Sequence, residues 1–175
     1  MIDAESVWST IELTMTEMQV AALVAGARQA SAVAKGFSGT KHGIPKESAF
    51  ALHFNGVCAE IATARAMGVY WPPSVDTFRG QPDIPAACGK PAVEVRWISQ
   101  ENYDLKLRKD DSPESCYVLV SGTAPTMHIR GWIYGKHGMV PEFWTDLGNG
   151  RPPLWCVPKR RLYGAGGRKP MEESE

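Results

Sequence analysis

The pattern of hydrophobic and polar positions divides this chain into a helical first part and a strand-rich second part. Near the N-terminus, "STIELT" alternates as a half-buried strand does. The alanine-rich residues 16–36 follow, in which Thr16 and Gln19 form a capping-box pattern. Lys35 and Gly36 supply the basic end and the glycine stop that are typical of a helix terminus. We therefore expect a short strand and then a long helix.

A second helix is predicted from about Ser48 to Gly68. Glu60 lies near the edge of its apolar face, and His53 has almost the same bearing about two turns earlier. An acid in this position can face a cleft. The apolar face itself follows the four-three spacing of one buried stripe and comprises Phe50, Phe54, Val57, Ile61 and Ala64.

Beyond "YWPP" the pattern changes to the period of two that is typical of strands. Turn clusters such as "KDDSPES" and "SGTAP" separate the apolar pieces, and the late segment "GNGRPPLWCVPKRRL" predicts a turn and one edge strand interrupted by prolines. The order of elements predicts an α+β fold in which helices flank a mixed central β-sheet. We expect one domain over residues 1–163 and a disordered tail over 164–175. The expected strands cover residues 93–98, 103–107, 117–121 and 127–134.

Composition and charge narrow the possible partners. The chain has 175 residues, of which 43% are hydrophobic and 22% charged, as in an ordinary globular domain. Its 19 basic and 19 acidic side chains cancel, so any polyanion must be held locally rather than by a field of the whole molecule. The four cysteines are far apart and form no C-x-x-C pair, which argues against structural zinc and predicts free thiols in a reducing cytoplasm. We expect no membrane partner, because no run approaches the ~18 apolar residues of a membrane span.

The candidate chemistry lies in "GQPDIPAACGKPAVEVRWIS", residues 80–99. Asp83 follows a proline, and Glu94 lies in a predicted strand between two valines. Glu94 and Arg96 point to the same face of that strand, since side chains alternate along it. A carboxylate in such a core-like strand needs a partner, either Arg96 or a metal ion. The alternative is a surface ion pair worth ~0 to 1 kcal/mol, as in a simple interaction module.

This combination of residues resembles the PD-(D/E)XK nuclease superfamily, in particular its small phage-type members. The similarity covers about residues 48–135: Pro82-Asp83, then Glu94-Val95-Arg96, with an acid on the preceding helix and a late strand "IRGWIYG". The resemblance implies a restriction-endonuclease-like core. It also implies Mg²⁺ or Mn²⁺, held by Glu60, Asp83, Glu94 and the main-chain carbonyl of Val95. Such hard cations take oxygen ligands of these kinds.

The chain departs from the family at Arg96, where lysine is usual. Arginine stays protonated and cannot accept a proton from water, although its fork can hold a phosphate. The resemblance therefore implies a metal-dependent nuclease that hydrolyses DNA in recombination, repair or processing. Its catalytic residues would be Glu60, Asp83, Glu94 and Arg96. The alternative is a nuclease-fold protein that binds nucleic acid as an accessory factor and cleaves weakly or not at all.

Weaker signals concern the nucleic-acid backbone. Several polar and basic residues could contact phosphates; the alternatives are a solubilising tail for the basic cluster near the end, a satisfied helix histidine for His53 and an exposed loop residue for Gln100. A homo-oligomer is compatible with the sequence. These backbone candidates are His53, Gln100, Lys41, Lys159, Arg160 and Arg161.

Overall fold

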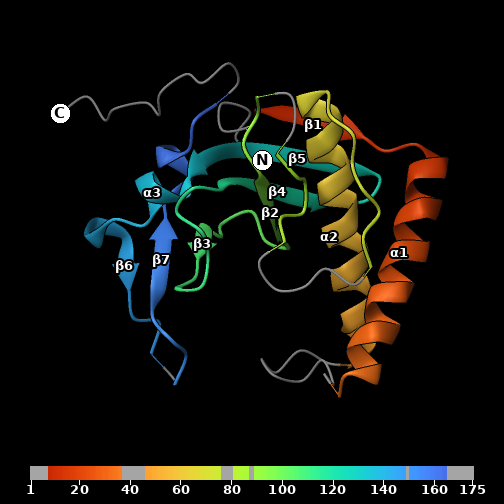
Figure 1. Ribbon diagram of the computed structural model, residues 1–175, viewed down its shortest axis with the longest axis horizontal. Coiled ribbons are helices and arrows are strands. Elements are labelled where there is room, and N and C mark those ends of the chain that lie inside the picture. The colour runs from red at the N-terminus through yellow and green to blue at the C-terminus, as the bar shows by residue number, and fades with distance from the viewer. Residues whose placement is uncertain (1–7, 37–45, 76–80, 87–88, 149, 165–175) are drawn as a thin grey trace.

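The protein is an α+β structure in which a four-stranded sheet lies between a pair of helices and a smaller three-stranded sheet (Figure 1). The computed structural model describes residues 8–36, 46–75, 81–86, 89–148 and 150–164. The expected tail, apart from Gly164, lies outside these residues. The predicted α+β class is confirmed, and the four-stranded sheet is mixed, as expected; the remaining described strands form a second, antiparallel sheet.

The first strand and helix form as the pattern predicts, with a different cap. Strand β1 (Ser9–Glu12) is followed by helix α1 (Met15–Ala34). The predicted capping box at Thr16 is wrong: Thr14 is the N-cap, and its backbone N–H donates to Glu17 at 2.7 Å. Glu17 also accepts from Arg65 at 3.1 Å, and this second partner favours the earlier position. Gly36, with φ of 73°, ends the helix as expected.

Helix α2 (Lys46–Met67) packs against α1 on one side and against the four-stranded sheet on the other. Val57, Ile61 and Ala64 of the predicted stripe are buried. Phe50 is 44% exposed, so its predicted burial is wrong; its ring stacks on Phe54 instead. The inward face of α2 is thus set by its second half, which carries the candidate acid.

The four-stranded sheet has the order β1-β5-β4-β2, with β1 and β2 at its edges. Its other members are β2 (Val93–Ile98), β4 (Cys116–Thr123) and β5 (Thr126–Tyr134). Strands β2 and β4 run parallel, while β5 is antiparallel to both of its neighbours. Because parallel neighbours need a crossover, residues 99–115 must cross the sheet between β2 and β4. That crossover brings further residues next to β2.

The three-stranded sheet is antiparallel with the order β3-β7-β6. It comprises β3 (Leu105–Leu107), β6 (Trp144–Thr145) and β7 (Leu154–Val157). The expected late strand is present as β7, but its predicted edge position is wrong because it lies between β3 and β6. Among the described residues, three short helical segments accompany these sheets: α3 (Gly135–Gly138), η2 (Pro141–Phe143) and η3 (Lys159–Arg161).

Each face of the four-stranded sheet covers its own hydrophobic core. Val93 and Val95 of β2 and Val118 of β4 belong to the core under the helices. Tyr117 and Leu119 belong to the second core, which the three-stranded sheet covers. Alternate residues of one strand therefore serve different cores, as a sheet with two covered faces requires.

Two further predictions concern thiols and membranes. Cys58, Cys116 and Cys156 are free, as expected, while Cys88 lies outside the described residues. Burial raises the pKa of the Cys58 thiol to about 11, which makes it a poor nucleophile. Within the described part of the chain, no helix has both the length and the apolar character needed to cross a membrane.

Candidate functional site

The candidate residues lie around the outer edge of β2, the edge that faces away from β4. The segment around Asp83 runs beside this edge: Ile84 exchanges backbone hydrogen bonds of 3.1 and 2.9 Å with Val93. Two residues further along β2, the Val95 N–H donates to Asp83 Oδ2 at 2.8 Å. Because the N–H and C=O of one strand residue point to the same side, the Val95 carbonyl also faces this edge. The motif thus brings its aspartate and its main-chain carbonyl to one place.

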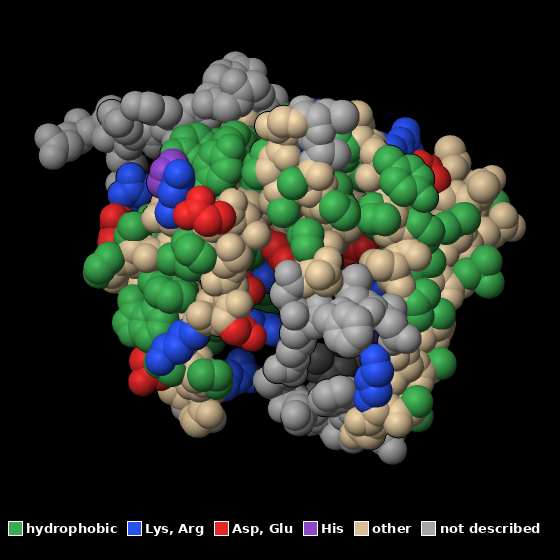
Figure 2. Space-filling view, in the orientation of Figure 1, with side chains coloured by type: hydrophobic (Ala, Val, Ile, Leu, Met, Phe, Trp, Pro, Cys, Tyr) green, Lys and Arg blue, Asp and Glu red, His purple; other side chains and the backbone are tan. Residues whose placement is uncertain are grey.

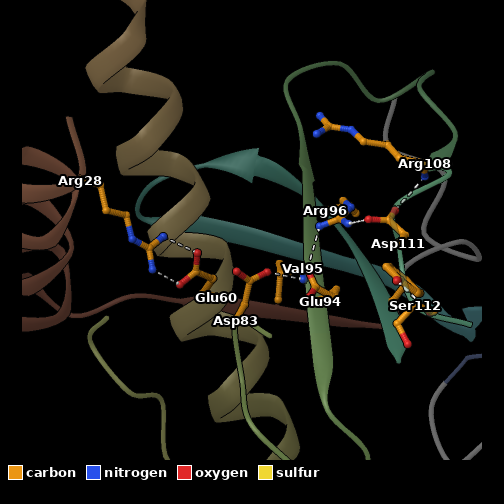
Figure 3. A network of polar contacts seen from close by, with 10 residues as sticks. Arg28, Glu60, Asp83, Glu94, Val95, Arg96, Arg108, Asp111 and Ser112 are labelled. Carbon is orange, nitrogen blue, oxygen red and sulfur yellow. Dashed lines mark hydrogen bonds and ion pairs between the residues drawn. The ribbon is translucent and has the colours of Figure 1, made fainter. Parts of the chain in front are cut away.

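Glu60 approaches the same edge from the helix side. It is only 5% exposed, and both of its oxygens are engaged by Arg28 of α1, at 2.6 and 3.0 Å. Trp71 Nε1 donates to Glu60 Oε2 at 3.0 Å, and Arg28 Nε donates to the Ser74 carbonyl at 3.0 Å. Asp83 lies between this ion pair and β2 (Figure 3). The helix acid is therefore fixed in place by a bidentate arginine.

Glu94 and Arg96 occupy the opposite face of β2 from the two buried valines. Arg96 donates to Glu94 at 3.1 Å and to Asp111, in the crossover, at 2.8 Å. Its guanidinium carbon lies 5.3 Å from the centre of the Tyr117 ring. The Glu94 and Arg96 side chains are 19% and 27% exposed. The expected Glu94–Arg96 pair is thus present, partly buried, and extended by a second carboxylate.

Burial and neighbouring charges perturb the acids. Burial, followed by the charge of Glu60, raises the pKa of Asp83 to about 7, although the Val95 N–H and Arg96 act in the opposite direction. Burial also raises the pKa of Glu94, against the lowering effect of Arg96. Burial, followed by the charge of Arg28, lowers the pKa of His53. The Val95 N–H and Arg96 thus offset only part of the cost of burying the Asp83 carboxylate beside Glu60.

The formal charges of the carboxylates and guanidinium groups in this cluster do not cancel. Four carboxylates and two guanidinium groups give −4 and +2, a sum of −2 when all are ionised. In Figure 2, acidic and basic side chains gather near the centre of the face, between the helices and the smaller sheet. Within the described ranges, however, no set of three His, Cys, Asp or Glu side chains is arranged to hold a metal ion. The carboxylates counted are Glu60, Asp83, Glu94 and Asp111, and the guanidinium groups are those of Arg28 and Arg96.

The weaker candidates other than His53 belong to other segments of the chain. Gln100 is exposed just beyond β2, and Lys159 donates its Nζ to the Glu101 carbonyl. Arg161 pairs with Glu142 at 2.7 Å. Arg160 is exposed on η3, and Lys41 lies outside the described residues.

Sequence reasoning missed Arg28, Trp71 and Asp111. Arg28 carried a signal, because it is one of only two charged residues in the 20-residue helix α1, and a charge on a helix that packs inward needs a partner. Asp111 lies in a cluster of turn residues, where aspartate is ordinary. Nothing in its local sequence indicates that its partner is 15 positions away.

Comparisons with family models, with curated proteins and with solved structures each gave no match. Function must therefore be argued from the residues of the site.

Proposed function

We propose that this protein is a metal-dependent nuclease that hydrolyses phosphodiester bonds of DNA. One observation carries the proposal: three carboxylates from three separate segments lie around the outer edge of β2, near enough for their charges to affect one another, with excess negative charge. These are Glu60 of α2, Asp83 beside the edge and Glu94 of β2. The PD-(D/E)XK-like motif in the sequence supports the same conclusion from an independent direction.

The donor set suits a hard divalent cation. Glu60, Asp83, Glu94 and the Val95 carbonyl offer the oxygens that Mg²⁺ or Mn²⁺ prefers. A formal charge of −2 on the cluster matches the charge of one such ion. Bound there, the ion would supply charge stabilisation at the phosphate and activate water for attack. Since these acids are not arranged to hold an ion as they stand, full ligation requires their side chains to move together, and Arg28 must release at least one Glu60 oxygen because it contacts both.

The remaining residues have electrostatic and positioning roles in this proposal. Arg96 stays charged and binds a phosphate oxygen or the negative charge that develops on it. The Val95 N–H fixes the Asp83 carboxylate against the strand. An Asp83 pKa of about 7 means that the carboxylate becomes fully available as a ligand only above neutral pH when no cation is bound.

A cleavage assay tests the proposal. Linear duplex, circular duplex and single-stranded DNA are incubated with Mg²⁺, with Mn²⁺ or with EDTA, and the parent protein is compared with Asp83→Asn and Glu94→Gln. Asp110→Asn is the matched control, because Asp110 is exposed in the neighbouring turn. We expect cleavage that depends on the divalent ion, falls at least 100-fold in the two site variants and is unchanged in the control. Equal cleavage by Asp83→Asn and the parent would contradict the proposal.

A second function is a nucleic-acid-binding protein that does not hydrolyse its ligand. The observation that favours it is the bidentate Arg28–Glu60 ion pair, which occupies the helix acid as a cation would. The same assay separates the two functions, since this protein would bind DNA and leave it intact at every concentration of divalent ion.

A further inference from the structure

The crossover between β2 and β4 contains a turn that is tied directly to Arg96. Asp111 Oδ1 accepts from Arg96 at 2.8 Å, and Asp111 Oδ2 accepts from the backbone N–H of Arg108 at 2.8 Å. The Asp111 N–H in turn donates to the Arg108 carbonyl at 3.1 Å. One carboxylate, 12% exposed, thus links the strand arginine to the loop arginine.

Arg96 is held on several sides and still has unused donors. The Glu94 and Asp111 contacts use one N–H on each terminal nitrogen, while a guanidinium group has five. The Tyr117 ring supports the guanidinium, and the Tyr117 hydroxyl donates to the Ser112 carbonyl at 3.0 Å, which fastens the turn to the sheet. Because 27% of its side chain is exposed, Arg96 can present its other donors to a ligand.

Arg108 contributes a second cation at the same turn. Its side chain is exposed, and among the described residues it forms no ion pair. Figure 3 shows its side chain extended from the turn; Arg108 contacts Asp111 through its backbone N–H and carbonyl. The neighbouring Lys109 behaves differently, since its Nζ lies 5.1 Å from the centre of the Trp144 ring on the smaller sheet. Of these two adjacent cations, only Arg108 is left without a partner in the described structure.

We propose that Arg96 and Arg108 form a phosphate-binding pair for the nucleic-acid backbone, with Asp111 as the residue that positions both. This inference rests on the proposed function and adds the residues that hold the substrate. Two guanidinium groups match adjacent phosphodiester oxygens, because arginine donates in a planar fork. Asp111 lowers the net charge of the turn, yet it strengthens binding because it holds the Arg96 guanidinium directly and fixes the backbone from which the Arg108 side chain extends.

Binding of a fluorescent DNA duplex, measured by anisotropy over a series of salt concentrations in EDTA and again in Ca²⁺, tests the pair. For Arg108→Gln we expect binding weaker by about tenfold, as for the loss of one charged hydrogen bond. The slope of log K against log salt should fall in magnitude by about 0.9, the value for one phosphate contact on duplex DNA. Lys109→Gln, with the same charge change one position away, should leave the slope close to that of the parent.

The Asp111→Asn variant distinguishes a positioning role of Asp111 from a simple effect of its charge. It adds one positive charge, so general attraction predicts tighter DNA binding, whereas a positioning role predicts binding several-fold weaker. Arg108→Gln is an exposed substitution and should unfold at the same urea concentration as the parent, which separates lost contacts from lost folding.

The results distinguish this inference from the proposed function. Tighter binding by Asp111→Asn, or equal slopes for Arg108→Gln and Lys109→Gln, would overturn the phosphate-binding pair while cleavage by the parent still stood. A parent protein that bound no DNA in either EDTA or Ca²⁺ would overturn both.

Discussion

Replacing Asp83 by asparagine should stabilise the protein at high pH and change it little at low pH. The pKa of Asp83 rises from 3.8 to about 7 in the folded protein, chiefly because the carboxyl is buried and Glu60 is nearby. A raised pKa means that the folded state binds the proton more tightly than the unfolded state does. The contribution of Asp83 to stability is therefore complete below about pH 4 and is lost as the pH rises through 7.

The size of this effect follows from the shift. At about 1.4 kcal/mol per pKa unit, the rise from 3.8 to about 7 corresponds to roughly 4 kcal/mol when the group is fully ionised. Asparagine has nearly the same shape, and its Oδ1 can still accept the Val95 N–H. We expect Asp83→Asn to match the parent near pH 4 and to exceed its free energy of unfolding by up to about 4 kcal/mol at pH 8.5.

Urea denaturation between pH 4 and 8.5, without divalent ions, measures this difference. Subtracting the parent curve removes the titration of groups that do not interact with Asp83, and Asp110→Asn controls for the loss of any surface carboxylate. Mg²⁺ at pH 8.5 should then stabilise the parent and not Asp83→Asn, because a ligand that binds only the folded state raises its stability. A difference between Asp83→Asn and the parent that stayed constant with pH would refute the reasoning.

Two other substitutions test the supports of the site by urea denaturation. Arg28→Ala should cost about 3–5 kcal/mol, because it leaves the Glu60 carboxylate, 5% exposed, without its ion-pair partner; a loss under ~1 kcal/mol would show that water replaces the guanidinium. Gly135→Ala should cost about 1–3 kcal/mol, since its Cβ would lie 2.4 Å from the Ser112 carbonyl oxygen and displace the turn that follows Asp111. Gly26→Ala in α1, where a Cβ meets nothing within 4 Å, should instead stabilise by about 0.5–1 kcal/mol, and equal effects of the two glycine substitutions would contradict the packing argument.

Local sequence patterns predicted most of the helices and strands, but they could not predict which strands pair with one another. Helix α2 and strands β2, β4 and β5 were predictable because each carries its own period of apolar residues. The parallel pairing of β2 with β4 was not, since it depends on the whole crossover folding over the second core. The position of β7 in the middle of a separate sheet has the same origin: its pairing with β3 is a long-range contact, and its other partner, the two-residue β6, is too short to show a period.

The candidate site shows the same division. Spacing alone indicated that Glu94 and Arg96 share a face, and the structure agrees. The partner of Glu60 could not be read from the sequence, because Arg28 is 32 positions away on another helix. The capping error at the start of α1 is instructive too: Thr14 and Thr16 both have a suitable residue three positions later, and only the tertiary contact of Glu17 with Arg65 separates them.

The contact between Asp83 and β2 also bears on solubility. An edge strand exposes a row of backbone donors and acceptors that can pair with another chain. Here Ile84 pairs with Val93, and the Asp83 carboxylate takes the next outward N–H, that of Val95, as the carbonyl of a neighbouring strand would. The charged side chain thereby closes the edge where a further strand would dock, so an alanine at position 83 would leave β2 open to edge-to-edge association between molecules.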